Sequence, residues 1–176
     1  MDKRLSENKR VKVCIAAAFF ELLQNRPADD ISVVEITARA QVSRMAYYRN
    51  FNSKTDIIEY YLSEIIWSDL NDYLDKDFVW LSTEFCIHFF EIMKKHREII
   101  LLLYDCGYAS IILNVFNLKN EELAGDMPAS SIEKYRLYCA AGAAFNIAIT
   151  WLRDGCKENT VDLIESLKAF FRKWSE

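Results

Sequence analysis

Glycine and proline are scarce in this sequence, whose 176 residues include only four glycines and two prolines. A β-sheet protein of this length needs many more of both in its tight turns, so an all-β fold is excluded. No window approaches about 18 uninterrupted apolar residues, which argues against a transmembrane helix. The N-terminus, Met1-Asp2-Lys3-Arg4, is charged and lacks the apolar core of a secretory signal. We therefore expect a cytoplasmic protein that does not engage a membrane.

Patterns for metal binding and catalysis are also missing. The only histidines, His88 and His96, do not have the i, i+4 spacing of a helical zinc pair. The five cysteines are an odd number without a C-x-x-C pair, so reduced thiols are expected rather than disulfides or a zinc site. No nucleophile motif or phosphate-binding glycine loop is present. The sequence thus predicts no metal, no cofactor and no enzymatic activity, with a helical enzyme kept only as an alternative.

The charge is distributed unevenly along the chain. Residues 1–55 contain ten Lys and Arg against six Asp and Glu, a net charge of +4, whereas the whole chain has a net charge of -4. A basic head on an acidic body suits a protein whose N-terminal part approaches phosphates. Random scatter also produces splits of this size, so the charge supports nucleic-acid binding without establishing it.

Apolar residues recur at helical spacing throughout, which predicts an all-α fold of about nine helices. An N-terminal three-helix helix-turn-helix domain is expected over residues 1–53, and an antiparallel helical C-terminal domain over residues 54–176. A loop is expected over residues 120–128, and Gly155 should end the penultimate helix in the left-handed conformation. Outside the helix-turn-helix, the predicted helices span about 6–24, 53–74, 79–94, 96–105, 108–120, 130–153 and 159–173.

The segment after Pro27 predicts two short helices joined by a tight turn. Ser32 and Glu35 have the S-x-x-E spacing of a capping box, which begins the first of them. Ser43 is expected to cap the second, which runs to about residue 50. Since only residues 40–42 separate these helices, they must cross steeply, as in a helix-turn-helix.

Residues 31–56, ISVVEITARAQVSRMAYYRNFNSKTD, resemble the DNA-binding domain of the TetR family of bacterial regulators. The family pattern is roughly T-x-x-x-I-A-x-x-A-G-V-S-x-G-T-x-Y-x-H-F-x-x-K, after an apolar-rich first helix. The matching positions are Ser32, Ile36, Ala40, Val42, Ser43, Tyr48, Phe51 and Lys54. The resemblance covers about residues 8–58 and implies a regulator that binds DNA through this helix-turn-helix.

A recognition helix in the major groove places its first residues near base edges and its flanks on phosphates. Arg44 is therefore expected to reach a phosphate or a guanine edge, and Tyr47 to offer its ring and hydroxyl near base edges. Tyr48 and Asn50 are expected on phosphate oxygens, and Lys54 adds its charge beside the first amides of the fourth helix. The expected DNA-binding residues are Ser32, Ser43, Arg44, Met45, Ala46, Tyr47, Tyr48, Asn50 and Lys54.

Four positions depart from the family pattern. Gln41 replaces the turn glycine and is expected at positive φ, at a cost of about 1 kcal/mol. Met45 and Ala46 replace a Gly-Thr pair, which prevents the closest backbone approach and removes a hydroxyl, and Asn50 replaces the common His. These changes keep an alternative open: a helical protein-interaction module, acting as a co-regulator or activator partner, with weakened DNA contacts. Phe51 retains its place and should pin the recognition helix to the fourth helix.

The C-terminal helices carry wide apolar faces, and residues 140–144 are all small. The resemblance implies a homodimer through the last two helices, bound to near-palindromic double-stranded DNA; the alternative is that these faces form intrachain core. The aromatic residues of the middle segment either line a pocket for an apolar small-molecule effector or are plain core. The expected function is a homodimeric repressor released by such an effector. The candidate pocket residues are Trp67, Phe85, Phe89, Tyr104, Tyr108, Phe116 and Phe145.

Overall fold

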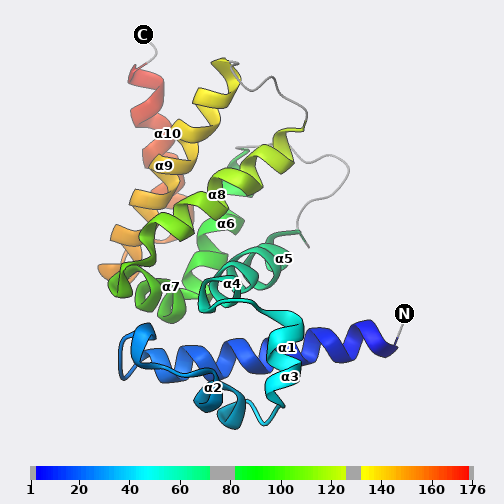
Figure 1. The fold of residues 1–176 in the computed structure, drawn as a ribbon. Helices are drawn as coiled ribbons and strands as arrows, with labels where there is room; N and C mark the ends of the chain where they lie inside the picture. The colour runs from blue at the N-terminus through cyan, green and yellow to red at the C-terminus, as the bar shows by residue number, and fades with distance from the viewer. Residues whose placement is uncertain (1–2, 72–81, 126–131, 175–176) are drawn as a thin grey trace. The chain divides into compact units, whose positions relative to one another are not determined.

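The computed structural model describes residues 3–71, 82–125 and 132–174, and within these ranges the chain is all-helical, without a strand (Figure 1). Packing divides the chain into two compact units, unit 1 (Met1–Ile65) and unit 2 (Ile66–Glu176). The functional boundary expected after residue 53 lies earlier than this division. The difference arises because the helix that follows residue 53 packs on the first helix of the chain.

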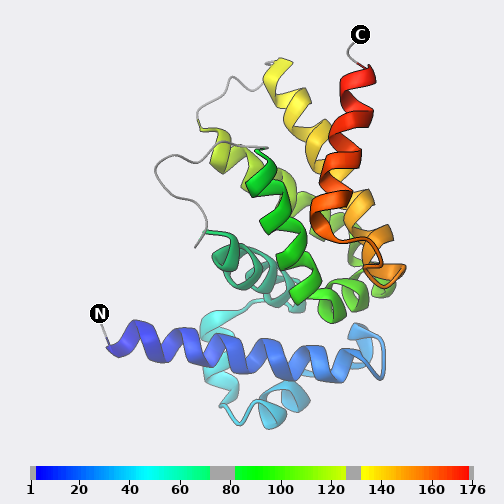
Figure 2. The same ribbon diagram turned by 180° about the vertical axis from the view of Figure 1, so that it is seen from behind.

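Unit 1 is built on its long first helix, α1 (Lys3–Leu23), which is coloured blue in Figures 1 and 2. Ile15, Phe19 and Leu23 recur every four residues and are buried, whereas Ala17 faces solvent. The next three α-helices of unit 1 all pack against α1. The apolar stripe that the sequence predicts on this helix is therefore the core of unit 1.

The helix-turn-helix forms where the sequence predicts it. Its helices are α2 (Val33–Arg39) and α3 (Arg44–Asn50). The Ser32 hydroxyl accepts a hydrogen bond from the Glu35 N–H at 3.2 Å, and the Glu35 carboxylate accepts one from the Ser32 N–H at 2.9 Å, which completes the capping box. The Ser43 hydroxyl caps α3 by accepting a hydrogen bond from the Ala46 N–H at 3.1 Å. Gln41, in the turn between the helices, has a φ of 55° and confirms the expected left-handed residue.

The fourth predicted helix contains a wide turn that the sequence does not reveal. It begins as α4 (Lys54–Tyr60), capped by Ser53, and continues through a π-helical turn over Tyr61–Ile66 into α5 (Trp67–Asn71). Turns of this kind often mark functional positions in helices. The expected end of this helix near residue 74 lies outside the described residues.

Helix α6 (Thr83–Lys95) supplies much of the core of unit 2. It is capped by Ser82, whose hydroxyl accepts a hydrogen bond from the Phe85 N–H at 3.1 Å. The expected start at residue 79 lies outside the described part of the chain. Three buried aromatic residues, Phe85, Phe89 and Phe90, lie on α6 within one and a half turns.

The next stretch is one apolar run broken by a glycine. It contains α7 (Arg97–Leu103), a π-helical turn over Tyr104–Tyr108 and α8 (Ala109–Ala124). By length and composition alone, Arg97–Leu123 is long and apolar enough to cross a membrane. Gly107, at a φ of 87°, interrupts this run in the left-handed conformation that glycine adopts without a steric penalty. Both α7 and α8 pack on a later helix of unit 2, so the run is used in packing.

The prediction of a loop over residues 120–128 is wrong for residues 120–124, which are helical. Helix α8 continues to Ala124 and ends at Gly125, which has a φ of 76°. Glu121, Glu122 and Leu123 are strong helix formers, so the helix persists until a glycine ends it. Residues 126–131, and with them the expected helix start at residue 130, lie outside the described residues.

The last two helices run antiparallel, as Figures 1 and 2 show. They are α9 (Ile132–Arg153) and α10 (Thr160–Trp174). Gly155, at a φ of 86°, follows the end of α9 as predicted, and Cys156 is left-handed too, with a φ of 53°. The Asn159 side chain accepts the Asp162 N–H at 2.9 Å and caps α10. Helix α8 packs along α9, and α10 packs on α6.

Candidate nucleic-acid interface

Helix α3 has one face in the core and one in solvent. Tyr47 is only 1% exposed, whereas Met45 is 72% and Tyr48 is 59% exposed. Arg44 and Arg49 are exposed as well, at i and i+5 on the same side as Met45 and Tyr48. We call these four residues, Arg44, Met45, Tyr48 and Arg49, the recognition face. A helix that presents two large apolar side chains and two cations to water is suited to contact another molecule.

The expectation that Tyr47 presents its ring to base edges is wrong. Its ring lies 6.1 Å from that of Phe51 and 5.4 Å from that of Tyr48, centroid to centroid. Burial raises the pKa of the Tyr47 hydroxyl, with a smaller contribution from the charge of Asp56. Phe51 is buried beside it and stacks edge-on against Tyr60, as its expected structural role requires. Tyr47 therefore holds α3 in place, and Tyr48 is the tyrosine available to a partner.

The side chain of Lys54 is also hydrogen-bonded within unit 1. Its ammonium donates hydrogen bonds to the backbone carbonyls of Ala28 and Ile31, the latter at 2.8 Å. These carbonyls belong to the segment between α1 and α2. Lys54 thus joins the start of α4 to the entry of the helix-turn-helix, rather than standing free for a phosphate as the sequence suggests.

The remaining expected residues have more local roles. Ser32 and Ser43 are exposed, and their hydroxyls already accept backbone N–H groups as helix caps. The Asn50 amide donates to the Ala46 carbonyl at 2.7 Å, so one of its polar groups is used inside α3. Ala46 is half-buried and presents no polar side chain. These residues lie next to the recognition face in sequence, and none of them adds a charged side chain to it.

Arg26 and Arg39, the other arginines close to the helix-turn-helix in sequence, are paired with carboxylates. Arg26 donates to Glu35 at 2.6 Å, and Arg39 donates to Glu21 at 2.7 Å. In the described part of unit 1, Arg44 and Arg49 have no such carboxylate partner. Arg49 was not among the expected DNA-binding residues. Its position one helical turn beyond Met45 and next to Tyr48 is the signal that identifies it.

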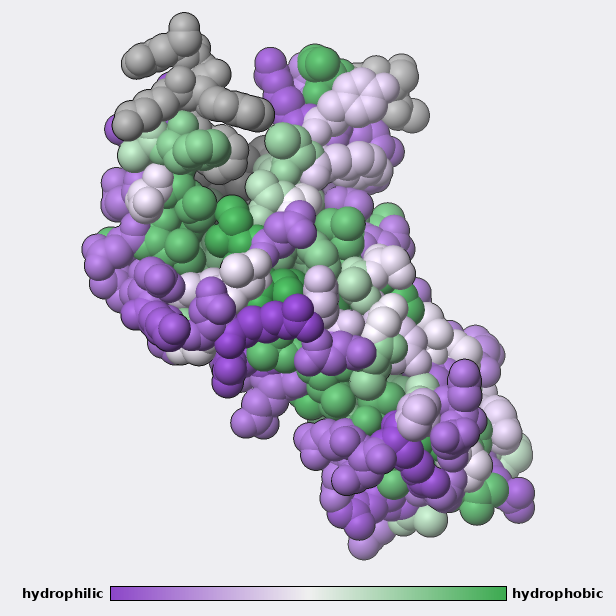
Figure 3. Space-filling view, turned by 90° about the vertical axis from the view of Figure 1, so that its left-hand side faces the viewer, coloured by the Kyte–Doolittle hydropathy of each residue, from purple (hydrophilic) through white to green (hydrophobic). Residues whose placement is uncertain are grey.

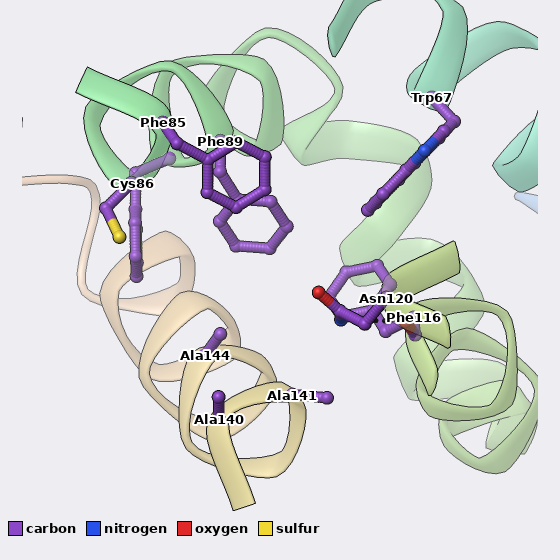
Figure 4. A pocket seen from close by; sticks show the side chains of 10 residues that line it. Trp67, Phe85, Cys86, Phe89, Phe116, Asn120, Ala140, Ala141 and Ala144 are labelled. Carbon is purple, nitrogen blue, oxygen red and sulfur yellow. Dashed lines mark hydrogen bonds between the residues drawn. The ribbon is translucent and has the colours of Figure 1, made fainter. Parts of the chain in front are cut away.

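Unit 2 contains a small cavity lined by part of the expected aromatic set. Trp67, Phe85, Phe89 and Phe116 line a cavity of about 50 Å³, which Figure 4 shows from close by. In that view the rings of α6 face Phe116 across the cavity, and the alanines of α9 form another side. Ligand pockets are commonly 300–1,000 Å³, so this cavity alone is too small for a drug-sized effector.

Tyr104, Tyr108 and Phe145 do not line this cavity. The Phe145 ring lies between Phe116, at 6.2 Å, and Tyr104, at 6.1 Å, as part of the aromatic core. Tyr104 in turn lies under the Arg153 guanidinium, 4.6 Å from ring centroid to Cζ. Tyr108 is half-buried in the π-helical turn before α8. Phe145 is therefore a core residue, whereas Tyr104 and Tyr108 are half-buried at the kink before α8.

Two of the solved structures that resemble this chain match nearly its whole length. The dihydroxyacetone kinase operon activator DhaS matches with a TM-score of 0.60 at 17% identity, over 93% of this chain and 95% of its own. NalD, the secondary repressor of the MexAB-OprM multidrug efflux pump in Pseudomonas aeruginosa, matches with a TM-score of 0.54 at 20% identity, over 94% and 96%. No family model and no curated protein matches the sequence. At these identities the likeness shows a shared all-helical fold alone.

Proposed function

We propose that this protein is a DNA-binding transcriptional regulator that acts in the cytoplasm as a homodimer. The observation that carries the proposal is the recognition face of α3, where two unpaired arginines flank exposed Met45 and Tyr48. Buried Tyr47 fixes the opposite face of the same helix. A short helix held rigidly on one side and presenting cations and an aromatic ring on the other suits the major groove.

Each residue of the recognition face has a distinct expected role in this proposal. Arg44, in the first turn of α3, lies where a recognition helix reaches base edges, and a guanidinium can bond the acceptor edge of guanine. Tyr48, one turn later, can donate its hydroxyl to a phosphate oxygen, and the positive charge of Arg49 can bind the phosphate backbone of the DNA. Met45 brings an apolar contact of the kind that reads a thymine methyl group.

Dimerisation is supported by the exposed apolar residues of unit 2. In the described ranges, Leu118 on α8 is exposed, and every other large apolar side chain exposed on unit 2 lies on α9 or α10. Exposed apolar side chains that gather on a few helices are typical of an interaction surface. Part of the expected small-residue surface is used internally, because Ala141 is buried within unit 2. The exposed apolar residues on these two helices are Ile132, Tyr135, Tyr138, Val161 and Phe170.

Two copies joined through α9 and α10 would present two recognition helices to a near-palindromic duplex. In this proposal the protein is a repressor, and a small molecule bound in unit 2 releases it from DNA. Such a ligand acts only by binding the DNA-free state more tightly than the DNA-bound state. The protein is a binding protein in this proposal, not an enzyme.

Selection of bound duplexes from a random DNA pool at several salt concentrations tests the proposal. We expect a near-palindromic site to be enriched, with an affinity that falls steeply as salt rises, because binding releases counterions from the phosphates. A folded dimer that enriches no sequence would contradict the proposal. It would favour the protein-interaction module instead, for which exposed Met45 and the missing hydroxyl at Ala46 are the supporting observations.

A further inference from the structure

Half of the positive charge of the basic head lies outside the helix-turn-helix. Of the ten Lys and Arg residues among residues 1–55, five form ion pairs, bind backbone carbonyls or belong to the recognition face. The other five all lie on α1, within the first twelve residues of the chain, where only Asp2 and Glu7 are acidic. They are Lys3, Arg4, Lys9, Arg10 and Lys12.

The N-terminal half of α1 contributes nothing to the core of unit 1. No side chain over residues 7–14 is buried, and burial on this helix begins at Ile15. Figures 1 and 2 both show this end of α1 extending past α2 and α3. Residues 3–14 correspond to about 18 Å of helix. Since most helical stability in proteins comes from the packing of a buried face, a stretch of this length that buries nothing is available to a partner.

A cation–π contact places this half of α1 beside the end of α3. The Lys12 ammonium lies over the ring of Tyr60, the last residue of α4, at 5.0 Å from its centroid. The same ring stacks edge-on against Phe51, with centroids 5.7 Å apart, and Phe51 is the C-cap of α3. Arg49 of the recognition face lies two residues before Phe51. The exposed part of α1 therefore begins at the end of α3 that carries Arg49.

Lys9 and Arg10 lie on different sides of α1. Lys9 precedes Lys12 by three residues and buried Ala16 by seven, so these three share a face of the helix. Arg10 precedes exposed Ala17 by seven residues and lies on the solvent side. Both cations are exposed, and in the described part of unit 1 neither forms an ion pair. Lys9 thus continues the packed face of α1 beyond the core, near the end of α3.

We propose that α1 is a second DNA-binding element, in which Lys9 binds a phosphate of the strand that borders the groove occupied by α3. The partner follows from charge complementarity, because duplex DNA carries one negative charge per about 1.7 Å of its axis. A phosphate contact has no sequence information, so Lys9 contributes affinity and salt dependence without base preference. The inference rests on the proposed function, since the same duplex contacts both elements.

Lys9→Gln and Arg10→Gln form a matched pair, because each removes one exposed cation from adjacent positions on α1. Fluorescence anisotropy measures the affinity of each full-length variant from 50 to 200 mM salt, for the selected duplex and for an unrelated duplex of equal length. We expect Lys9→Gln to reduce the slope of log affinity against log salt by about 1 on both duplexes, and Arg10→Gln to leave it unchanged. An unchanged slope in Lys9→Gln, or equal reductions in the two variants, would overturn the proposal.

Methylphosphonate substitution locates the contact on the DNA. One phosphate at a time is replaced by this neutral group along each strand of the selected duplex. Replacement of the phosphate bound by Lys9 should weaken wild type about tenfold, the value of one hydrogen bond between charged groups, and should leave Lys9→Gln unaffected. If every replacement weakens the two proteins equally, Lys9 binds no phosphate and the proposal is wrong.

The outcome is separable from that of the proposed function. If selection enriches no sequence, the unrelated duplex still reports the salt slopes, so the role of Lys9 is tested without an operator. A protein that enriches a site and keeps its slope in Lys9→Gln overturns only the inference about α1. A folded protein that binds neither duplex at 50 mM salt overturns both. Far-ultraviolet circular dichroism of the two variants should match wild type, because both side chains are exposed.

Discussion

Adjacent tyrosines on α3 have opposite roles because neighbouring residues of a helix point about 100° apart. Tyr47 lies four residues before Phe51, on the same side of the helix, and both are buried. Tyr48 and Arg44 share the other side and are exposed. Since Phe51 was expected to be structural, the same spacing already indicated that Tyr47 is a core residue.

Tyr47→Ala and Tyr48→Ala should therefore have different effects. We expect Tyr47→Ala to lower the free energy of unfolding by about 3–5 kcal/mol, as for other large aromatic residues truncated in a core. Tyr48→Ala should change it by less than about 1 kcal/mol, the value of one aromatic contact, while reducing affinity for the selected duplex. Urea unfolding and fluorescence anisotropy measure the two effects. A Tyr48→Ala protein with full DNA affinity would remove Tyr48 from the recognition face.

Substitutions of Lys54 and Arg44 should distinguish a structural cation from a DNA-binding cation. Lys54→Met should lower the free energy of unfolding by about 1–3 kcal/mol, because it removes the ammonium that donates to the carbonyls of Ala28 and Ile31. Arg44→Gln should leave stability unchanged and reduce the slope of log affinity against log salt by about 1, the loss of one phosphate contact. A reduced slope in Lys54→Met, with unchanged stability, would restore Lys54 to the DNA contacts.

The sequence predicts the caps and the tight turn but not the use of Lys54. Ser32 with Glu35, Ser43 and Gln41 are local signals, since each involves residues within one or two turns. The partners of Lys54 lie 23 and 26 residues away in the chain, so nothing in its own neighbourhood indicates them. Local hydrogen bonds can be predicted from spacing, whereas long-range ones depend on the completed fold.

Among the elements, α2 illustrates how a capping box acts beyond its own helix. Its Glu35 carboxylate accepts hydrogen bonds from the Ser32 backbone, from Arg26 and from the Ser32 hydroxyl. Arg26 lies three residues after the end of α1, so the Glu35 side chain joins the start of α2 to the beginning of the α1–α2 connection. The hydrogen bonds, chiefly that from the Ser32 backbone, lower the pKa of Glu35 from 4.5 to about 2.

The lowered pKa of Glu35 predicts a specific acid dependence. A depressed carboxyl pKa stabilises the folded state fully above the unfolded value, and this contribution is lost as the pH falls from 4.5 toward about 2. Glu35→Gln should flatten the dependence of the free energy of unfolding on pH in that window, and make the protein less stable at neutral pH. Urea unfolding at closely spaced pH values measures both effects. Glu59→Gln, at an exposed position on α4, is the control, and an equal effect there would contradict the assignment.

The π-helical turns show where element prediction from the sequence stops. The apolar periodicity predicts a helix from about residue 53 and separate helices around residues 96–105 and 108–120, and these exist. It does not predict the π-helical turn over Tyr61–Ile66, whereas the gap that it leaves between residues 105 and 108 coincides with a kink, where Gly107 has a φ of 87°. Gly107 was the only local signal for the second of these interruptions.

At the scale of the whole molecule, a hollow of about 350 Å³ and the proposed dimer face share the last two helices. The hollow is lined by residues of α6, α9 and α10, and Figure 3 shows hydrophobic residues gathered on the side of the molecule that carries the last two helices. The exposed residues Tyr135 and Phe170 lie outside its lining. The resemblance already implied a dimer through the last two helices, but the lining of the hollow could not be located from the sequence, because alanines at helical spacing do not reveal which of them surround a space. Their arrangement depends on how α10 packs on α6.

The dimer proposal is tested most directly by one charged substitution on α10. Phe170→Glu places a carboxylate on a side chain that is 56% exposed, so the fold should tolerate it, whereas a buried dimer contact should not. Leu118→Glu, at a residue 50% exposed on α8, is the matched control. We expect sedimentation to show monomer for Phe170→Glu at concentrations where wild type and Leu118→Glu are dimeric. Affinity for a near-palindromic duplex should fall with it, since two half-sites are then bound separately. If Phe170→Glu stays dimeric and Leu118→Glu dissociates, the interface lies on α8, and the pairing of recognition helices must be assigned to that surface instead.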